Sequence, residues 1–144
     1  MGEPVNNGIT AQTLLGTWLL GNVTEVDENG QAREDAYGSG AMGMIMYSPD
    51  GYMSAVVRGE RDARPVTVAY SGTYSLDNGV LRHHVCVGIP PFDSDQTRHP
   101  ELLAPDTLKL STGERGRART EITWRRARGG AARADGRTQR GSQE

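Results

Sequence analysis

The chain has 144 residues, a length that allows one domain with a core large enough to fold without disulfide bonds. Its single cysteine excludes an internal disulfide, and the lack of any run of 18 apolar residues argues against a membrane-spanning helix. The net charge of −2 and the absence of zinc-type Cys/His spacings argue against nucleic-acid binding and a metal site. We therefore expect a cytoplasmic protein with no metal, no cofactor, and neither nucleic acid nor membrane as a partner.

The two ends of the chain differ in composition from its middle. Residues 1–11 are polar, and residues 127–144 contain four arginines but no apolar residue larger than alanine. Such segments bury too little surface to offset the entropy that is lost on ordering. We predict a flexible N-terminus over residues 1–11, a folded domain over residues 12–126 and a disordered tail over residues 127–144.

Short runs rich in Val, Ile, Thr, Tyr and Met alternate with turn signals in the predicted domain, as is typical of an antiparallel all-β fold. A short helix is predicted before the first run, with Thr10 as its N-cap. The sequences SPDG at residues 48–51 and DNG at residues 77–79 favour tight turns between neighbouring strands. The eight predicted strands cover residues 14–25, 43–48, 52–58, 67–76, 80–87, 97–103, 107–111 and 119–126.

Eight antiparallel strands either close into a barrel that can hold one small ligand or form a sandwich of two sheets. Signals at both ends of the domain favour the barrel. A Gly-x-Trp sequence ends at Trp18 in the first strand, and a Trp-x-Arg sequence ends at Arg126 in the last. This pair resembles the signature of lipocalin-like barrels, in which an arginine packs over the indole by a cation–π contact and closes one end of the barrel.

The resemblance extends beyond these two signals: residues 14–126 resemble the bacterial lipocalin-like domain family that is often found beside natural-product biosynthesis genes. One departure follows Arg98, where His99 and Pro100 replace the usual aromatic pair, and the proline predicts an edge or a bend in that strand. The resemblance implies a closed antiparallel eight-stranded barrel. Because functions in the family are mixed, it implies the fold more strongly than the activity. The segments that carry it are residues 43–55, 70–74, 81–85 and 96–98.

Side-chain alternation in the predicted strand 80–87 predicts that one histidine lies in the barrel interior. One face of this strand carries Leu81, His83, Val85 and Val87. We expect this apolar face to point inward, which makes His83 an interior imidazole and His84 an outer one. A register shift of one residue would exchange the two histidines. His83 is thus a candidate general acid or base, and a hydrogen-bonded core histidine is the equal alternative.

Arg98 and Tyr47 complete the predicted catalytic set. Arg98 has Gln96 as its neighbour on the same strand face, and an inward arginine needs an anionic oxygen as its partner. Arg98 is therefore a candidate to hold an anionic or enolising oxygen, although a surface arginine paired with Asp93 or Asp95 is an equally good interpretation. Tyr47 is included because a phenol on a half-buried strand can present its hydroxyl to a cavity.

The predicted ligand-binding residues are aromatic, thioether or polar side chains on the predicted strands. For most of them ordinary core packing is the competing interpretation. Cys86 has no partner for catalysis and is expected on the outer face. The predicted set is Tyr70, Tyr74, Met44, Met46, Met53, Gln96 and His84.

Together these features predict a cofactor-independent enzyme that acts by acid/base catalysis on a small molecule bound in the barrel. One interior acid/base group and one fixed cation suffice for a cyclase, an isomerase or a dehydratase. The resemblance implies a polyketide-like or aromatic metabolite of natural-product biosynthesis. We expect a small hydrophobic or anionic ligand, and a homodimer is left open. The alternatives are a non-catalytic binding or carrier protein of lipocalin type and, less favoured, an interaction module that acts through its basic tail.

Overall fold

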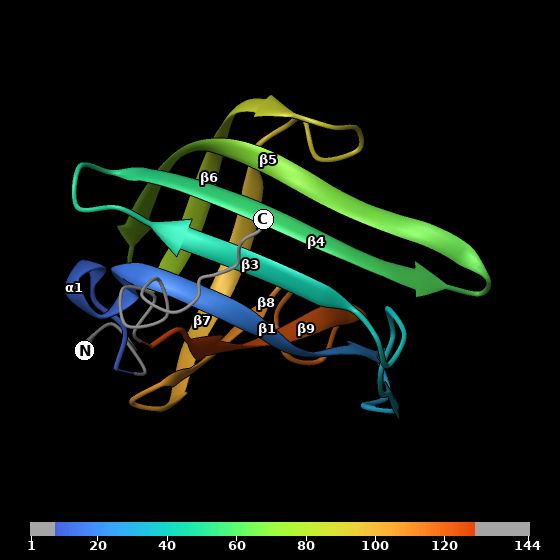
Figure 1. Ribbon diagram of the computed structural model, residues 1–144. Helices are drawn as coiled ribbons and strands as arrows, with labels where there is room; N and C mark the ends of the chain where they lie inside the picture. Colours follow the sequence, from blue (N-terminus) through green and yellow to red (C-terminus); the bar gives the residue numbers. More distant parts are fainter. Residues whose placement is uncertain (1–7, 129–144) are drawn as a thin grey trace.

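The computed structural model describes residues 8–128 and shows an all-β fold with one short helix (Figure 1). The helix α1 spans Ala11–Leu14, and the side chain of Thr10 accepts a hydrogen bond from the N–H of Thr13 at 3.2 Å. The predicted helix and its N-cap are thus confirmed. Ile9 is buried in the core, although it falls in the segment expected to be flexible. The predicted disordered tail lies outside the described residues, apart from its first two residues.

Within residues 8–128, nine strands form, and eight of them match the predicted strands to within a few residues. The remaining strand is the two-residue β2, which pairs only with the end of β1. The strands are β1 (Gly16–Val26), β2 (Ala32–Arg33), β3 (Met42–Tyr47), β4 (Tyr52–Arg61), β5 (Arg64–Asp77), β6 (Val80–Gly88), β7 (Gln96–Ala104), β8 (Thr107–Ser111) and β9 (Arg119–Arg126).

The eight longer strands close into an antiparallel barrel. Strands β3 to β9 follow one another as neighbours, and β9 returns to pair with β1 from Trp18↔Arg126 to Val26↔Arg119. The predicted barrel is confirmed, and the alternative of an open sandwich is wrong. Strand β7 pairs with β6 over three residues, up to Leu81↔Arg98, and Pro100 beyond them pairs across to β8 alone. This is the departure from regular pairing that the proline predicts.

Trp18 and Arg126 close the end of the barrel that carries α1. The guanidinium carbon of Arg126 lies 4.1 Å from the ring centroid of Trp18, which confirms the predicted cation–π contact. Arg126 also donates hydrogen bonds to the carbonyls of Leu15 and Thr13, each at 3.0 Å. The indole N–H of Trp18 donates to the carbonyl of Leu14 at 3.0 Å. The carbonyls at the end of the helix, which have no partner within it, are therefore satisfied by the two side chains that seal the barrel.

A bulge in β6 interrupts the alternation of inward and outward side chains. Gly72 of β5 pairs with Val85, whereas the preceding residue pairs with Val87, so Cys86 is the extra residue. A Cβ at Gly72 would overlap the carbonyl oxygen of His84, so only glycine allows this close approach. Beyond the bulge the alternation is reset, and Val87 is 69% exposed. The prediction that Val87 faces inward is therefore wrong, whereas Cys86 is exposed as expected.

The methionines of β3 lie on the outer face of the barrel. Met44 and Met46 are both 43% exposed, while the alternate residues Ile45 and Tyr47 are buried. Met44 and Met46, two of the predicted ligand-binding residues, therefore lie outside the barrel interior, because the strand register directs the aliphatic and aromatic side chains inward. Met53 on β4 is buried in the core.

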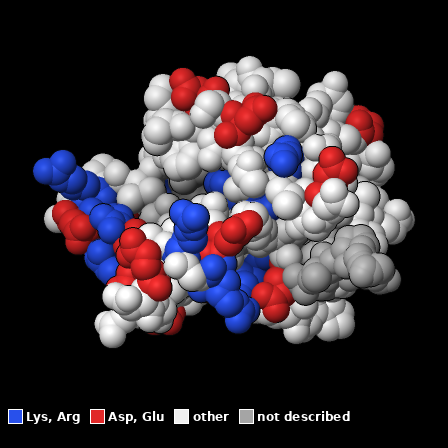
Figure 2. Space-filling model, turned by 180° about the vertical axis from the view of Figure 1, so that it is seen from behind, with Lys and Arg blue, Asp and Glu red and all other residues white. Residues whose placement is uncertain are grey.

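Charged side chains of both signs are interspersed on the face shown in Figure 2. Ion pairs of the described residues include Lys109 with Glu101 at 3.3 Å and Arg119 with Glu121 at 2.7 Å. Opposite charges thus neutralise one another locally. In the described part of the chain, no helix has the length and apolar character needed to cross a membrane.

Candidate functional site

The interior of the barrel contains a small, largely enclosed cavity of about 60 Å³. This is the liquid volume of about two water molecules, and pockets for drug-sized ligands measure about 300–1,000 Å³. The cavity therefore accommodates a group of a few atoms rather than a whole metabolite. Its walls are Tyr37, Ile45, Ala55, Val57, Val68, Tyr70, His83, Phe92, Arg98, Leu110, Thr112, Thr120, Ile122 and Trp124.

His83 is fully buried in the cavity wall and is held between two tyrosines. Its Nε2 lies 2.8 Å from the hydroxyl of Tyr47, and its Nδ1 lies 2.7 Å from the hydroxyl of Tyr70. The three residues come from β6, β3 and β5. Strand alternation therefore places His83 inside, as predicted, and the neighbouring strands supply a phenol for each ring nitrogen. A chain of three titratable groups results.

Burial decides the charge state of this chain. Burial, together with the smaller effect of the positive charge of Arg98, lowers the pKa of His83 to about 3. Burial also raises the pKa of Tyr70 and raises that of Tyr47 well above the ordinary value for a phenol. All three groups are therefore uncharged at neutral pH, so each hydroxyl and the imidazole can donate one hydrogen and accept another.

Arg98 is the one charged residue among those that line the interior cavity. It is 9% exposed and donates to the carbonyl of Thr97 at 2.9 Å and to Oε1 of Gln96 at 3.5 Å. Within residues 8–128 no carboxylate lies within ion-pair distance of its guanidinium. The interpretation as a surface arginine paired with Asp93 or Asp95 is therefore wrong. A buried cation that lacks an internal counter-ion favours an anionic or polarised oxygen beside it.

A second hollow, of about 640 Å³, lies between the β1–β2 hairpin and the start of β9. We call it the entrance hollow. Thr112 and Thr120 line both the cavity and this hollow, so the two spaces adjoin at these residues. At its rim, Arg61 donates to Glu25 at 2.7 and 2.8 Å, which lowers the pKa of that carboxyl.

The remaining predicted ligand-binding residues take different places. Tyr74 packs edge-on against Tyr47 and donates to the carbonyl of Ser48 at 3.0 Å. Gln96 lies opposite His83 in the sheet and contacts Arg98, so it belongs to the surroundings of the site. His84 points away from the cavity and contacts Asp95 through Nδ1 at 3.4 Å. The structure thus brings His83, Arg98 and Tyr70 into the cavity wall, with Tyr47 behind His83.

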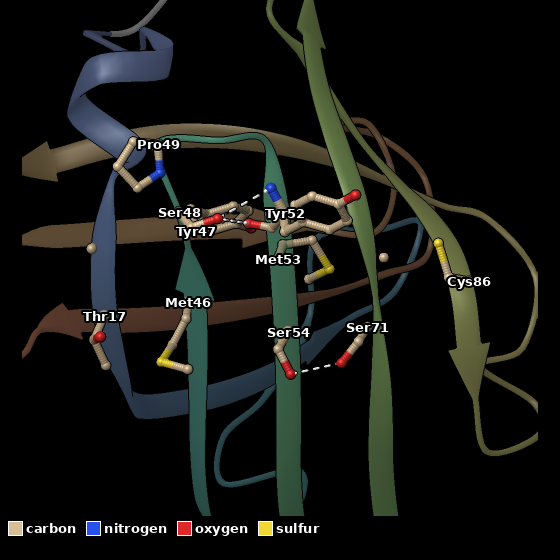
Figure 3. Close-up of a pocket in the computed structure, with 12 residues that line it drawn as sticks. Thr17, Met46, Tyr47, Ser48, Pro49, Tyr52, Met53, Ser54, Ser71 and Cys86 are labelled. Atoms are coloured by element: carbon tan, nitrogen blue, oxygen red, sulfur yellow. Dashed lines mark hydrogen bonds between the residues drawn. The ribbon is translucent and has the colours of Figure 1, made fainter.

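A third hollow, of about 580 Å³, lies beside the β3–β4 turn, outside the barrel interior (Figure 3). Met46, Met53 and Tyr52 contribute to its walls, and the hydroxyls of Ser54 and Ser71 lie 2.8 Å apart at its edge. None of the residues that line it is charged. Despite its size it lacks a charged group to orient a substrate. The smaller interior cavity is therefore the candidate site.

Among the cavity-lining residues that sequence reasoning did not name as site residues, three are aromatic. Trp124 is 2% exposed, and it lies two residues before the inward-facing Arg126, so strand alternation could have placed it inside. Tyr37 belongs to the β2–β3 connection, whose fold is set by contacts such as the N–H of Glu60 with the Tyr37 carbonyl at 2.9 Å. Phe92 stacks on Tyr70 from the β6–β7 connection. Loop residues of this kind carry no periodic signal.

Among solved structures, the chain is similar to a redesigned beta barrel, with a TM-score of 0.45 and 18% identity over 81% of this chain and 94% of that one. It is also similar to a de novo designed fluorescence-activating beta barrel, with a TM-score of 0.44 and 16% identity over 85% of this chain and 99% of that one. A third is the redesigned beta barrel mFAP1 bound to DFHBI, with a TM-score of 0.42 and 21% identity over 81% and 97% of the two chains.

No curated protein matches the chain. A family model does match, and it covers residues 15–68, which run from the start of β1 into β5. The matched part includes Gly16 and Trp18 of the Gly-x-Trp sequence. The resemblance predicted from the sequence is therefore confirmed, and residues 15–68 of this chain match the lipocalin-like domain family.

Proposed function

We propose that the barrel binds a small organic molecule at its interior cavity and catalyses proton transfer on it without a cofactor. The observation that carries this proposal is the chain Tyr47–His83–Tyr70 in the wall of a cavity whose one charged lining residue is Arg98. A general acid or base must lie within hydrogen-bond reach of the proton that it moves, and a fixed cation stabilises an enolate or similar oxyanion.

The three groups allow a balanced proton transfer. A substrate carbon loses its proton to the oxygen of Tyr70 while the hydroxyl proton of Tyr70 passes to Nδ1 of His83. Arg98 stabilises the negative charge that develops on the substrate oxygen. In an isomerisation, the proton on His83 returns to Tyr70, and Tyr70 gives its proton to a different atom of the substrate. In a dehydration or ring closure, the same transfer protonates the oxygen that leaves as water.

The low pKa of His83 is compatible with this role only when a ligand is bound. The positive charge of Arg98 is the second cause of the low pKa, after burial. An anionic oxygen at Arg98 would offset that charge and bring the pKa of His83 closer to the range in which a base works at neutral pH. Catalysis would thus depend on the charge of the bound ligand.

The size of the site sets how a substrate would lie. The interior cavity of about 60 Å³ takes the reacting group, and the entrance hollow of about 640 Å³ takes the rest of the molecule. A polyketide-like or aromatic metabolite would enter in this way past Thr112 and Thr120. The biosynthetic role itself rests on the family resemblance and stays a prediction.

A test uses hydrogen–deuterium exchange at an acidic C–H bond. Acetoacetate and the neutral diketone acetylacetone are incubated in D₂O with the protein, and loss of their C–H signals is followed by proton NMR. We expect exchange about 10²–10⁴-fold faster than in buffer for a molecule that the site accepts. His83→Gln and Tyr70→Phe should remove most of this acceleration. Tyr52→Phe, which alters an exposed phenol, is the matched control.

A carrier protein of lipocalin type is the second candidate. Both ring nitrogens of His83 are already bonded to tyrosines, which also suits a purely structural histidine. In that case the same molecules would bind, as seen from shifts in protein NMR signals, without any faster exchange. Binding with unchanged exchange rates would thus contradict the enzyme and favour the carrier.

A further inference from the structure

The polar groups that line the interior cavity carry more hydrogen-bond donors than acceptors. The guanidinium of Arg98 has five N–H groups, and it donates to the carbonyl of Thr97 and to Oε1 of Gln96. No Asp or Glu side chain lines the cavity. Arg98 therefore has N–H groups that no carboxylate in the described part of the chain accepts.

Trp124 adds a second donor. Its indole N–H is buried and has no hydrogen-bond acceptor among the described residues. Such a group is expensive to leave unpaired in a protein interior, so native structures seldom do so without a reason. Trp18 shows the contrast, because its indole N–H donates to the carbonyl of Leu14. Trp124 and Arg98 line the same cavity from β9 and β7.

The tyrosine–histidine chain supplies a third donor. Uncharged Tyr47, His83 and Tyr70 together carry three polar hydrogens, namely two O–H and one N–H. The two hydrogen bonds of the chain use two of these hydrogens. One hydroxyl hydrogen is left over. When Nδ1 of His83 donates to Tyr70, the spare hydrogen is that of Tyr70, whose side chain lines the cavity.

We propose that the interior cavity binds the carboxylate group of an organic monoanion, held by Arg98 as its charge partner and by Trp124 as a further donor. A carboxylate accepts hydrogen bonds at both oxygens and donates none, which suits a site rich in donors. Its single negative charge balances the one arginine, and it is small enough for the volume of the cavity. The proposal rests on the interior binding site proposed above, but it does not require turnover.

The rest of the ligand lies in the entrance hollow, beyond Thr112 and Thr120. Arg33, Arg61 and Arg119 line that hollow together with Glu25 and Asp27. All three arginines are ion-paired, Arg33 and Arg61 with Glu25 and Asp62, and Arg119 with Glu121, so their charges are balanced locally. The ligand's carboxylate is therefore held by Arg98 in the cavity, whose guanidinium has no carboxylate partner among the described residues.

The experiment measures binding of benzoate by the indole N–H signals in a proton–nitrogen NMR spectrum. The two tryptophans give two such signals, which Trp124→Phe assigns. We expect benzoate to shift the Trp124 signal saturably and to leave that of Trp18 in place, since Trp18 already donates to Leu14. Benzyl alcohol, which has the same ring without the charge, should shift neither signal.

Variants test the two donors separately. Arg98→Gln should weaken benzoate binding by about 10-fold or more, since hydrogen bonds to charged groups are the stronger ones. Trp124→Phe should weaken benzoate binding several-fold; because this variant lacks the Trp124 signal, its binding is measured by the change in tyrosine fluorescence. The affinity of Arg98→Lys for benzoate should lie between those of wild type and Arg98→Gln. Arg82→Gln changes an exposed arginine of β6 and should leave binding unchanged. An unshifted Trp18 signal in each variant shows that the barrel is intact.

Three results would overturn the proposal. They are an unshifted Trp124 signal at saturating benzoate, equal shifts from benzyl alcohol, and an equal loss of affinity in Arg82→Gln. The proposed enzyme activity is tested separately, by the C–H exchange experiment. If benzoate binds but the C–H exchange of acetoacetate is not accelerated, the carboxylate site is upheld and the enzyme activity is contradicted. If the C–H exchange of acetylacetone is accelerated but benzoate binds no better than benzyl alcohol, the enzyme activity is upheld and the carboxylate site is contradicted.

Discussion

The hydroxyl of Tyr70 lies 2.7 Å from Nδ1 of His83, and this hydrogen bond joins β5 to β6 inside the barrel. Tyr70→Phe would remove the hydroxyl and leave a buried ring nitrogen unpaired. We expect the free energy of unfolding to fall by about 1–3 kcal/mol, measured by urea denaturation. Tyr52→Phe, at a 57% exposed tyrosine, should change it little, and equal losses would contradict the role of this bond.

The low pKa of His83 predicts how stability depends on pH. The folded state keeps His83 neutral down to a pKa of about 3, whereas the unfolded chain protonates it near 6.5. The unfolded state therefore binds more protons between these values, and stability falls as the pH is lowered through that range. The contribution of His83 is fully present above pH 6.5.

Comparison of variants isolates this effect. Between about pH 4.5 and 6.5 the wild type should lose up to about 1.4 kcal/mol of unfolding free energy per pH unit through His83. His83→Gln should lack this part of the slope, whereas His84→Gln, at a histidine on the outer face, should keep it. Below this pH range the unfolding free energy should fall further, because Glu25, whose pKa is lowered by its hydrogen bond to Arg61, binds a proton more readily in the unfolded chain. Identical slopes in wild type and His83→Gln would refute the assignment.

Arg126 should matter more for stability than its neighbour Arg125. Arg126→Gln would remove the cation–π contact with Trp18 and two charged hydrogen bonds to the carbonyls of Thr13 and Leu15. We expect a loss of about 2 kcal/mol or more in thermal or urea unfolding. Arg125→Gln alters an exposed side chain on the same strand and should stay within about 0.5 kcal/mol of wild type. A larger effect at Arg125 would show that the barrel end is sealed differently.

Gly72→Ala tests the bulge in β6. The added methyl group would overlap the backbone of His84, so either the strands separate or the bulge is lost. We expect a loss of about 2–4 kcal/mol, as for other changes that force backbone to move in a core. Gly40→Ala, where nothing lies within 4 Å, is the control. If both variants unfold at the same urea concentration, the close approach at Gly72 is not what keeps β6 in place.

Much of the fold could be predicted because its signals are local and repeated. Turn sequences and period-two patterns fixed eight strands, and the pair Trp18 and Arg126 indicated closure. The two-residue β2 has too few residues to show a period. Val87 was misplaced because the alternation is reset at a bulge, and a bulge depends on how closely two backbones approach at Gly72. That distance is a tertiary property.

The candidate site was predictable in part for the same reason. His83 follows the alternation of its strand into the interior, and Arg98 lies there without a carboxylate partner in the described residues. The tyrosines at the two ring nitrogens could be expected as interior phenols, but not as a pair on one imidazole. That pairing depends on the registers of β3, β5 and β6 together, and no single segment of sequence contains it.

The seam between β1 and β9 joins the beginning of the domain to its end. Arg126 binds the carbonyl of Thr13, a residue 113 positions earlier in the chain. Contacts between such distant positions form late, because the chain must first lose the entropy of a long loop. The hairpins from β3 to β6 can form beforehand from neighbouring residues. We therefore expect folding on a timescale of about milliseconds to seconds, with formation of this seam as its slow step.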